Sequence, residues 1–244
     1  MRDAVIVSTA RTPIGKAYRG AFNNTTPQAL SAHAIEHAVK RAGVDPSEIS
    51  DVVWGSALQQ GHSGGNIARQ AAIRAGLPVT VAGMSLDRQC ASGMMAIATA
   101  AKQVVMDGMD VVIGGGSESI SMVQTPEMRV KGDPWLKENK PEIYMSMLET
   151  AETVAARYNV SRERQDAYAA ESQKRTHEAQ EAGKLDDEVV AMTTKMMVQN
   201  KETKEITLHE VTLSKDEGNR PSTSEESLAG LQPVFKDGIH IKEG

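Results

Sequence analysis

The sequence predicts an α/β fold, in which a mostly parallel sheet carries helices on its faces. Short apolar runs rich in β-branched residues alternate with helical stretches through the first half of the chain, and the links between them are short. Aromatic residues make up only 3% of the 244 residues, whereas the hydrophobic types together reach 40%. This aliphatic composition suits helices packed against a buried sheet.

Four apolar runs predict the strands of this sheet. The first, AVIVST at residues 4–9, is a continuous β-branched run, which indicates a strand buried on both faces. The other three lie at residues 51–58, 81–87 and 110–116. In open sheets of this kind the chemistry lies beyond the carboxyl ends of the strands.

Three helices are expected between these strands. Thr26 can cap the first helix, with Pro27 in its first turn and Gly43 at its end. The stretches 65–76 and 91–108 predict the other two helices.

The second half of the chain is more charged than the first. Residues 1–120 carry ten Lys and Arg and nine Asp and Glu, against seventeen and twenty-three in residues 121–244. We therefore expect a domain boundary near Ser121. The second half predicts helices at 147–158 and 161–183, followed by two strands around the polar turn at 200–204.

Composition and charge also limit the partners and the cellular compartment that the sequence supports. The net charge of −5 gives no support to nucleic acid as a partner. A single cysteine cannot form an internal disulfide, which favours a reducing compartment. We see neither a signal-peptide pattern nor an apolar run of membrane-spanning length, so the sequence predicts a cytoplasmic protein without a membrane segment.

Cys90, the only cysteine, lies between a predicted strand and a predicted helix. The free N–H groups and the dipole at a helix start would stabilise a thiolate there. The small residues Ala91, Ser92 and Gly93 leave room for a bulky acyl group, and Arg88 adds a nearby cation. A buried, inert thiol is the competing interpretation, and the residues alone leave the two about equally supported.

A second motif, HAIEH from His33 to His37, matches the H-x-x-E-H pattern of inverted zinc peptidases. The two histidines would share a helix face, and Glu36 would act as general base. The same spacing also places them on the solvated face of an amphipathic helix, which is the favoured interpretation. The glycines of GGGSES at 114–119 lack the spacing of a phosphate loop, and close packing explains them better.

Six blocks in order resemble the N-terminal part of the thiolases, enzymes that make or cleave 3-ketoacyl-CoA. The blocks are ARTPIGKAYRGAF, GGNIARQAA, LDRQCASGMMAI, IGGGSESIS, TAETVAARYNVSRERQDAYAAESQKR and NRPSTSEESLAGLQPVF. The resemblance implies a thiolase-like layered fold. Residues 1–120 would form a core domain with an incomplete sheet, and residues 121–244 a loop domain that covers the active site and binds CoA. It also implies a homodimer or homotetramer acting in fatty-acid β-oxidation.

The resemblance implies an acyltransferase in which Cys90 carries the acyl group as a thioester. The backbone N–H of Cys90 would donate to the oxyanion. Coenzyme A and acyl-CoA would be substrates, with no bound cofactor and no metal. Arg220 matches a position that contacts the adenine-nucleotide end of CoA, Ser227 and Phe235 match positions near CoA, and Met147 matches one by the pantetheine tunnel.

Thiolases continue past the point where this sequence ends, and further strands of the first sheet are expected there. That portion holds the histidine that activates the cysteine, and a second, acid/base cysteine. The chain is interpreted as a fragment of a full enzyme, or alternatively as a natural short subunit that needs a partner. In either case residues 1–244 alone are expected to lack turnover. A non-catalytic CoA-binding fragment is the rival function, and a zinc peptidase is a remote one.

Overall fold

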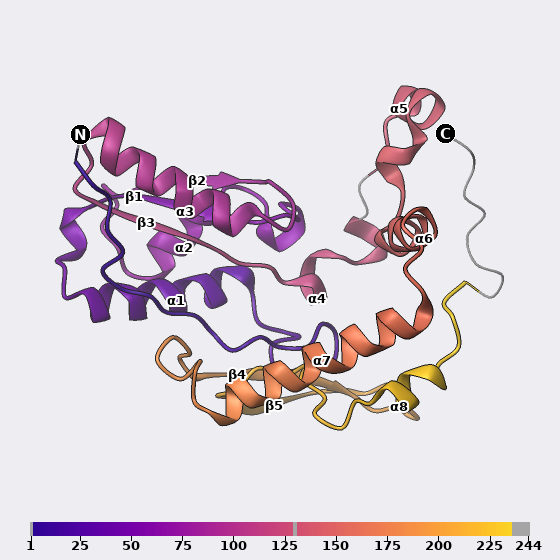
Figure 1. Cartoon of the computed structure of the whole chain (residues 1–244). Helices are drawn as coiled ribbons and strands as arrows, with labels where there is room; N and C mark the ends of the chain where they lie inside the picture. The colour runs from indigo at the N-terminus through magenta and orange to yellow at the C-terminus, as the bar shows by residue number, and fades with distance from the viewer. Residues whose placement is uncertain (1, 129–130, 236–244) are drawn as a thin grey trace. The chain divides into compact units, whose positions relative to one another are not determined.

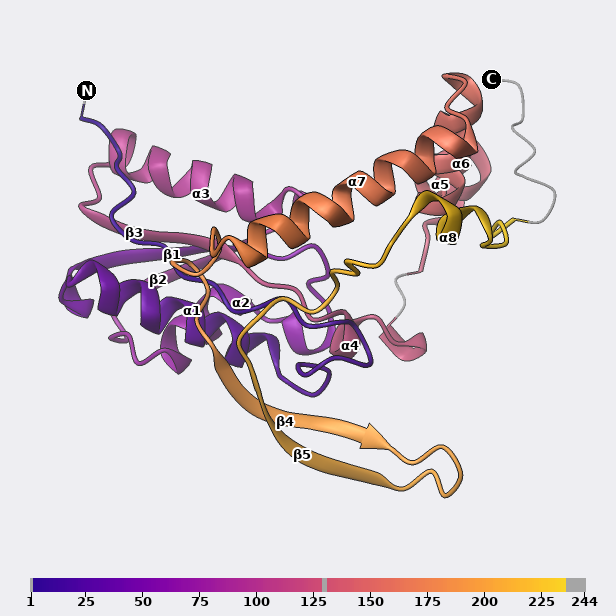
Figure 2. The same ribbon diagram turned by 60° about the horizontal axis from the view of Figure 1, so that its bottom comes forward.

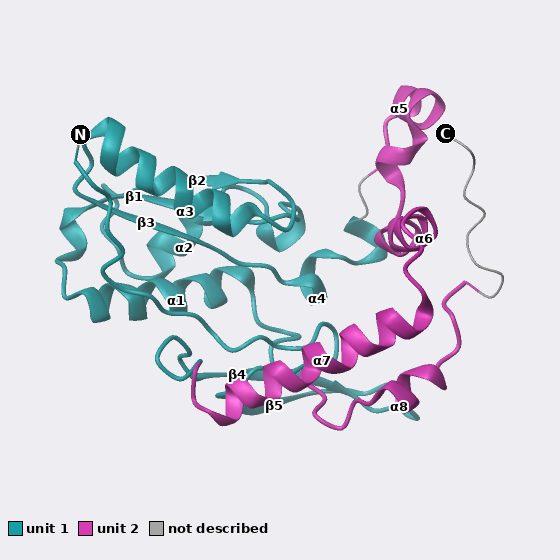
Figure 3. Ribbon diagram, in the orientation of Figure 1, with its two compact units in different colours: residues 1–129, 185–218 teal, residues 130–184, 219–244 magenta. Residues whose placement is uncertain are grey.

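The computed structural model describes residues 2–128 and 131–235 (Figure 1). It divides into two compact units, which are described separately (Figure 3). The first comprises Met1–Arg129 and Leu185–Gly218, and the second Val130–Lys184 and Asn219–Gly244. The predicted division into domains 1–120 and 121–244 rests on charge and on the thiolase resemblance, and it stays a prediction.

A three-stranded parallel sheet forms the centre of the first unit. Strand β1 (Ile49–Gly55) lies between β2 (Ala82–Leu86) and β3 (Val111–Gly116). At the middle of β1, Val53 is in register with Met84 on one side and Gly114 on the other. The parallel sheet predicted from the apolar runs is therefore confirmed for these three strands.

Helices cover both faces of the sheet, and the pleat of β1 explains why. Val52 and Trp54 point into a core shared with α1 (Pro27–Ala42) and α2 (Ile67–Arg74), whereas Val53 points into a core with α3 (Ser92–Lys102). Figures 1 and 2 show α3 on one side of the sheet and α1 with α2 on the other. Val52, Val53 and Trp54 are all buried, as expected for a strand covered on both faces.

The helix ends follow the expected capping chemistry. The Thr26 hydroxyl accepts a hydrogen bond from the Ala29 N–H, and Gly43 closes α1 with a left-handed φ of 67°. Asn66 caps α2 by accepting from the Arg69 N–H. A π-helical turn at Gln103–Asp107 extends α3 and ends at Gly108, where φ is 76°.

The prediction of a strand at residues 4–9 is wrong for this structure. Residues 4–9 run extended but have no strand partner, and Val5, Ile6 and Val7 are 76%, 77% and 68% exposed. A strand needs a neighbouring backbone that completes its hydrogen bonds, and the described residues supply none here.

The two strands predicted around the polar turn are confirmed as an antiparallel hairpin, β4 (Met192–Gln199) with β5 (Ile206–Leu213). Arg11 joins the base of this hairpin to the rest of the first unit. Its guanidinium donates to Glu188 at 2.6 Å and to Asp216 at 2.7 Å, just outside the two strands. A short helix, α4 (Ile120–Val123), follows β3.

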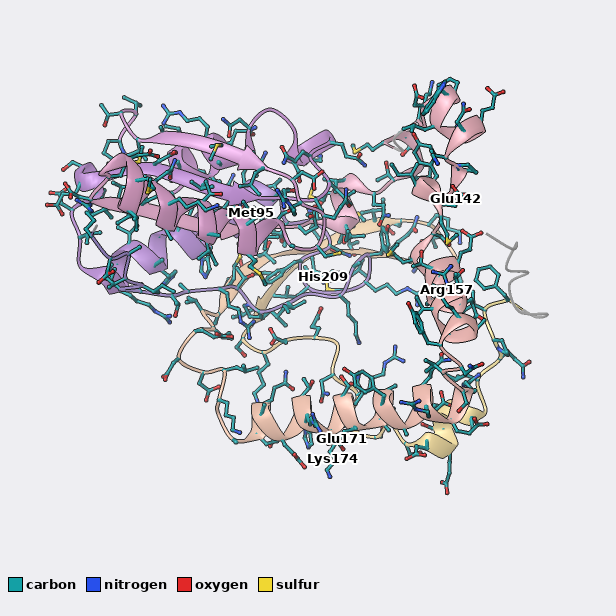
Figure 4. All side chains as sticks on the ribbon, turned by 45° about the horizontal axis from the view of Figure 1, so that its top comes forward. Met95, Glu142, Arg157, Glu171, Lys174 and His209 are labelled. Carbon is teal, nitrogen blue, oxygen red and sulfur yellow. The ribbon has the colours of Figure 1, made fainter. Side chains whose placement is uncertain are left out.

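The second unit is helical. It contains α5 (Pro134–Asn139), α6 (Met147–Arg157), α7 (Arg162–Glu181) and α8 (Glu225–Ala229). Helix α7 is mostly exposed and carries ion pairs one turn apart, from Glu171 to Arg175 and from Lys174 to Glu178; Figure 4 labels the first residue of each pair. None of the described helices is long and apolar enough to cross a lipid bilayer.

Candidate active site around Cys90

Cys90 lies where β2 turns into α3. Strand β2 ends at Leu86 and α3 begins at Ser92, so the thiol stands beside the start of a helix that follows a sheet strand. The residue is exposed. Cys90 is therefore not a buried core thiol, and it lies near the N–H groups that the start of a helix leaves without intrahelical partners.

Side chains on both sides of Cys90 hold the turn in one conformation. The Ser92 hydroxyl accepts from the Arg88 N–H at 2.8 Å and donates to the Gln89 carbonyl at 2.6 Å. The Asp87 carboxylate accepts from the Gln89 N–H at 2.7 Å. These three bonds brace the backbone of Arg88 and Gln89, immediately before the thiol.

Gln89 adopts a left-handed conformation, with φ at 48°. A non-glycine residue in this conformation costs free energy, and strained residues of this kind cluster at functional sites. Sequence patterns gave no sign of it, because glutamine is not enriched in this conformation. Ser92 is buried, and its bracing role was also missed, although a serine two residues after the cysteine was visible in the motif.

Glycines let α3 approach the sheet closely beneath Cys90. A Cβ added to Gly55, at the end of β1, would overlap the backbone of Ser92. A Cβ on Gly116, at the end of β3, would lie 3.2 Å from the Cα of Gly93. One on Gly114 would lie 2.9 Å from the Cα of Ile97. The GGGSES glycines therefore serve packing, as the sequence indicated.

Two methionines follow Cys90 in the first turn of α3. Met94 is 75% exposed and Met95 is half-buried, one turn beyond Cys90 (Figure 4). Flexible, polarisable thioethers can adapt to acyl chains of different shape. In the second unit, Met147 begins α6 and is also exposed, at 74%.

The remaining candidates for CoA binding lie in the second unit with Met147, and they are described within that unit only. The exposed Arg220 is anchored through its backbone N–H, which donates to the Gln173 side chain on α7 at 2.7 Å. Ser227 belongs to α8, where its hydroxyl accepts from the Ser224 N–H and donates to the Ser224 carbonyl. Phe235, the last described residue, is half-buried.

Helix α7 contacts both the segment that carries Arg220 and the helix that carries Ser227. Arg162, at the start of α7, donates to the carbonyl of Leu228 in α8, next to Ser227. Gln173, which holds Arg220, is eleven residues further along the same helix, or roughly 16 Å at 1.5 Å per residue. Helix α7 therefore anchors both segments, at two points along its length.

His33 and His37 do face each other on α1, with ring centroids 4.6 Å apart. Burial lowers the pKa of His37, and the His33 ring and two nearby cations act in the same direction. Within residues 2–128 and 131–235, no cluster of three potential ligands surrounds the pair. A catalytic zinc needs three protein ligands, so the peptidase interpretation gains no support.

Comparison with known proteins identifies the group to which this site belongs. The family description "Thiolase, N-terminal domain" matches residues 4–241. The chain belongs to the thiolase family. Its thiolase-like fold is confirmed by a Bacillus anthracis acetyl-CoA acetyltransferase, with a TM-score of 0.78 and 36% identity over 98% of this chain and 60% of that one.

Curated thiolases show the same relation in sequence. A 3-ketoacyl-CoA thiolase of Bacillus subtilis is 40% identical over 96% of this chain and 60% of its own length. The peroxisomal 3-ketoacyl-CoA thiolase B of Mus musculus is 36% identical over 97% of this chain and 54% of its own length. The chain thus spans about 60% or less of these thiolases.

Proposed function

We propose that this chain supplies the nucleophilic cysteine of an acyltransferase that cleaves 3-ketoacyl-CoA with CoA, or runs the reverse condensation. The observation that carries the proposal is the exposed Cys90 at the start of α3, held by a braced turn in a chain of the thiolase family. Sulfur suits this role because a thiolate is both a good nucleophile and a good leaving group.

In the thiolysis direction, the Cys90 thiolate attacks the ketone carbon of 3-ketoacyl-CoA. Negative charge then develops on the ketone oxygen, where N–H groups at the helix start can donate to it. The bond between the second and third carbons breaks, and acetyl-CoA leaves as an enolate that takes up a proton. The shortened acyl group stays on Cys90 until the CoA thiol attacks it and the cysteine leaves. Condensation follows the same steps in reverse.

The second unit would contribute to CoA binding. Arg220 presents an exposed guanidinium suited to the phosphates of an adenine nucleotide, since planar N–H donors match phosphate oxygens. Ser227 and Phe235 would lie near CoA, and Met147 along the pantetheine arm. Helix α7 supports this assignment, because it anchors the segments that carry Arg220 and Ser227.

The wider setting follows from the same proposal. We place the enzyme in the cytoplasm and in fatty-acid β-oxidation, acting as a homodimer or homotetramer on CoA-linked substrates. It would use no bound cofactor and no metal ion, because thioester exchange on cysteine needs neither.

The direct test is intact-mass measurement after incubation with acetyl-CoA. One added acetyl group is expected on the chain and none on Cys90→Ala, which would identify the acylated atom because the chain has no other cysteine. Ser121→Ala, which leaves the Cys90 turn intact, serves as the matched control and should acylate normally. Acetylation that persists in Cys90→Ala would contradict the proposal.

Turnover by residues 1–244 alone is not expected. The thiolase resemblance places the activating histidine and the acid/base cysteine outside these residues. Acetoacetyl-CoA cleavage that depends on added CoA, measured on the isolated chain, would refute this. A non-catalytic CoA-binding role is favoured instead if the chain retains CoA affinity while Cys90 stays unacylated.

A further inference from the structure

Two imidazoles lie next to each other on α1, in a part of the first unit that the function proposed above does not use. His33 and His37 are one helical turn apart, and both side chains are half-buried. Their ring centroids are 4.6 Å apart and the rings are inclined at 53°, so they are not stacked face to face. The sequence has six histidines, and only these two lie within four positions of each other.

The helix that carries the two histidines is held at both ends and along its opposite face. Thr26 caps its start and Gly43 closes its end. On the opposite face Ser31, Ala32 and Ile35 are buried. The backbone therefore fixes the spacing of the two histidines, and a ligand that binds both rings has only side-chain rotations left to order.

The distance between the two rings matches that of two imidazoles bound to one metal ion. With metal–nitrogen bonds of about 2.1 Å and an angle of roughly 90–110° between them, two such rings have centroids roughly 4.5–5.2 Å apart. The distance of 4.6 Å between His33 and His37 lies within this range. An ion could therefore bind both rings without a change in the helix.

The surroundings of the two rings also favour a metal ligand. Nε2 of His33 is buried and has no hydrogen-bond partner among the described residues, and a bound ion would satisfy such a nitrogen. Burial and the neighbouring His33 ring lower the pKa of His37. Lys40 and Arg41 act in the same direction, against the charge of Glu36. His37 is thereby kept in the neutral form, which is the form that binds metal.

We propose that His33 and His37 together bind one late first-row divalent ion, such as Ni²⁺, Cu²⁺ or Zn²⁺, with water in the remaining coordination positions. Imidazole nitrogen suits these ions, whereas Mg²⁺ and Ca²⁺ prefer oxygen ligands.

The site differs from that of a zinc peptidase, because no group of three potential ligands includes the two histidines within residues 2–128 and 131–235. The ion would join two successive turns of α1 and stabilise the folded chain. It takes no part in thioester exchange on Cys90, so the inference is independent of the proposed function.

Isothermal titration calorimetry of the untagged chain with Ni²⁺ at pH 8 tests the site. We expect saturable binding of one ion per chain and no binding of Mg²⁺ at the same concentrations. His33→Gln and His37→Gln should each weaken Ni²⁺ binding by about 100-fold, because each imidazole raises the effective concentration of the other. The double variant should lose little more than either single variant, since one remaining imidazole cannot chelate the ion.

Two control variants separate this site from other ligands. His62→Gln removes an exposed imidazole that lies on a short 3-10 helix away from any other histidine in the sequence, and it should bind Ni²⁺ as the natural chain does. Cys90→Ala removes the one thiol and should also leave Ni²⁺ affinity unchanged. Circular dichroism of each variant establishes that it folds.

Electron paramagnetic resonance of the natural chain with one equivalent of Cu²⁺ tests the site without any variant, and should show two nitrogen ligands. A spectrum with a single nitrogen ligand, or no saturable binding of Ni²⁺, would overturn the inference. So would an equal loss of affinity in His62→Gln, which would mean that scattered histidines bind the ion. A loss in Cys90→Ala would overturn it too, because the thiol would then be the ligand.

Discussion

Gly55 at the end of β1 lies directly against the backbone of Ser92, the first residue of α3, with no room for a Cβ between them. Gly55→Ala must therefore push the start of α3 away from the sheet. We expect a loss of about 1–3 kcal/mol in the free energy of unfolding, the usual range for overpacking. Denaturant unfolding measures the loss, and amide exchange in the first turn of α3 should rise with it.

Gly93→Ala is the matched control for that experiment. A Cβ at position 93 would have no heavy atom within 4 Å, and the residue lies inside α3. Alanine should therefore fit and should stabilise the helix by up to about 1 kcal/mol. If both variants lost equal stability, close approach at Gly55 would not be the cause.

Gln89 offers a test of the braced turn. Its φ of 48° is unfavourable for side chains with a Cβ. Gln89→Gly should raise the free energy of unfolding by up to about 1 kcal/mol, part of the relief being offset by the greater freedom of glycine in the unfolded chain. Gln89→Val should lower it by at least as much, since a β-branched residue resists this conformation. The opposite order in thermal unfolding would show that the turn relaxes in solution.

The parts of the fold set by local pattern were predictable from the sequence. Strands β1 to β3, helices α1 to α3 and the hairpin of β4 and β5 follow apolar periodicity and end at caps such as Thr26 and Gly43. The position of Cys90 at a strand-to-helix junction followed from the same pattern.

Features that depend on distant neighbours were not predictable. AVIVST has the composition of a buried strand, but a strand exists only where another backbone pairs with it, and residues 4–9 have none among the described residues. The contact of Gly55 with Ser92 joins segments 37 residues apart, and the Arg11 contact with Asp216 spans 205 residues. The identity of a single residue does not indicate which distant residue it will contact.

The Arg11 pairs make the hairpin base sensitive to mutation. Arg11→Met removes the guanidinium that donates to Glu188 and Asp216, and should cost about 2 kcal/mol, as for hydrogen bonds to charged groups. Lys174→Met on exposed α7 is the control, and should change stability by less than about 0.5 kcal/mol. Similar losses in both variants would argue against a special role for Arg11.

The same contact predicts an acid transition. Burial acts to raise the pKa of Asp216, but hydrogen bonds from Arg11 and from the Ile14 N–H, with the charge of Arg11, outweigh it and lower the pKa below 3.8. The stabilisation is therefore present above pH 3.8 and lost as pH falls through the folded-state value. Unfolding free energies measured from pH 6 to 3 should fall more steeply in the natural chain than in Asp216→Asn. Parallel curves would contradict the assignment.

His37 predicts a second pH effect at higher pH. Burial, the neighbouring His33 ring, Lys40 and Arg41 lower its pKa below 6.5. The folded state thus binds this proton less readily than the unfolded state, so stability is full above pH 6.5 and declines as pH falls toward the folded value. His37→Gln should flatten the dependence between pH 7 and 5. A His37 resonance that titrates above 6.5 would disprove the prediction directly.

Asp51 and Gln103 form a buried pair that one substitution should improve. Gln103 donates to one carboxylate oxygen of Asp51 at 2.8 Å, while the other Asp51 oxygen and the Gln103 carbonyl are buried without a partner among the described residues. Asp51→Asn would replace the unpaired oxygen with an amide donor, which can serve the unpaired carbonyl of the neighbouring Gln103. We expect a gain of about 1 kcal/mol in unfolding free energy. Asp51→Leu removes the acceptor of the Gln103 amide and should therefore lower the unfolding free energy. A higher unfolding free energy in that variant would show that the polar contact is dispensable.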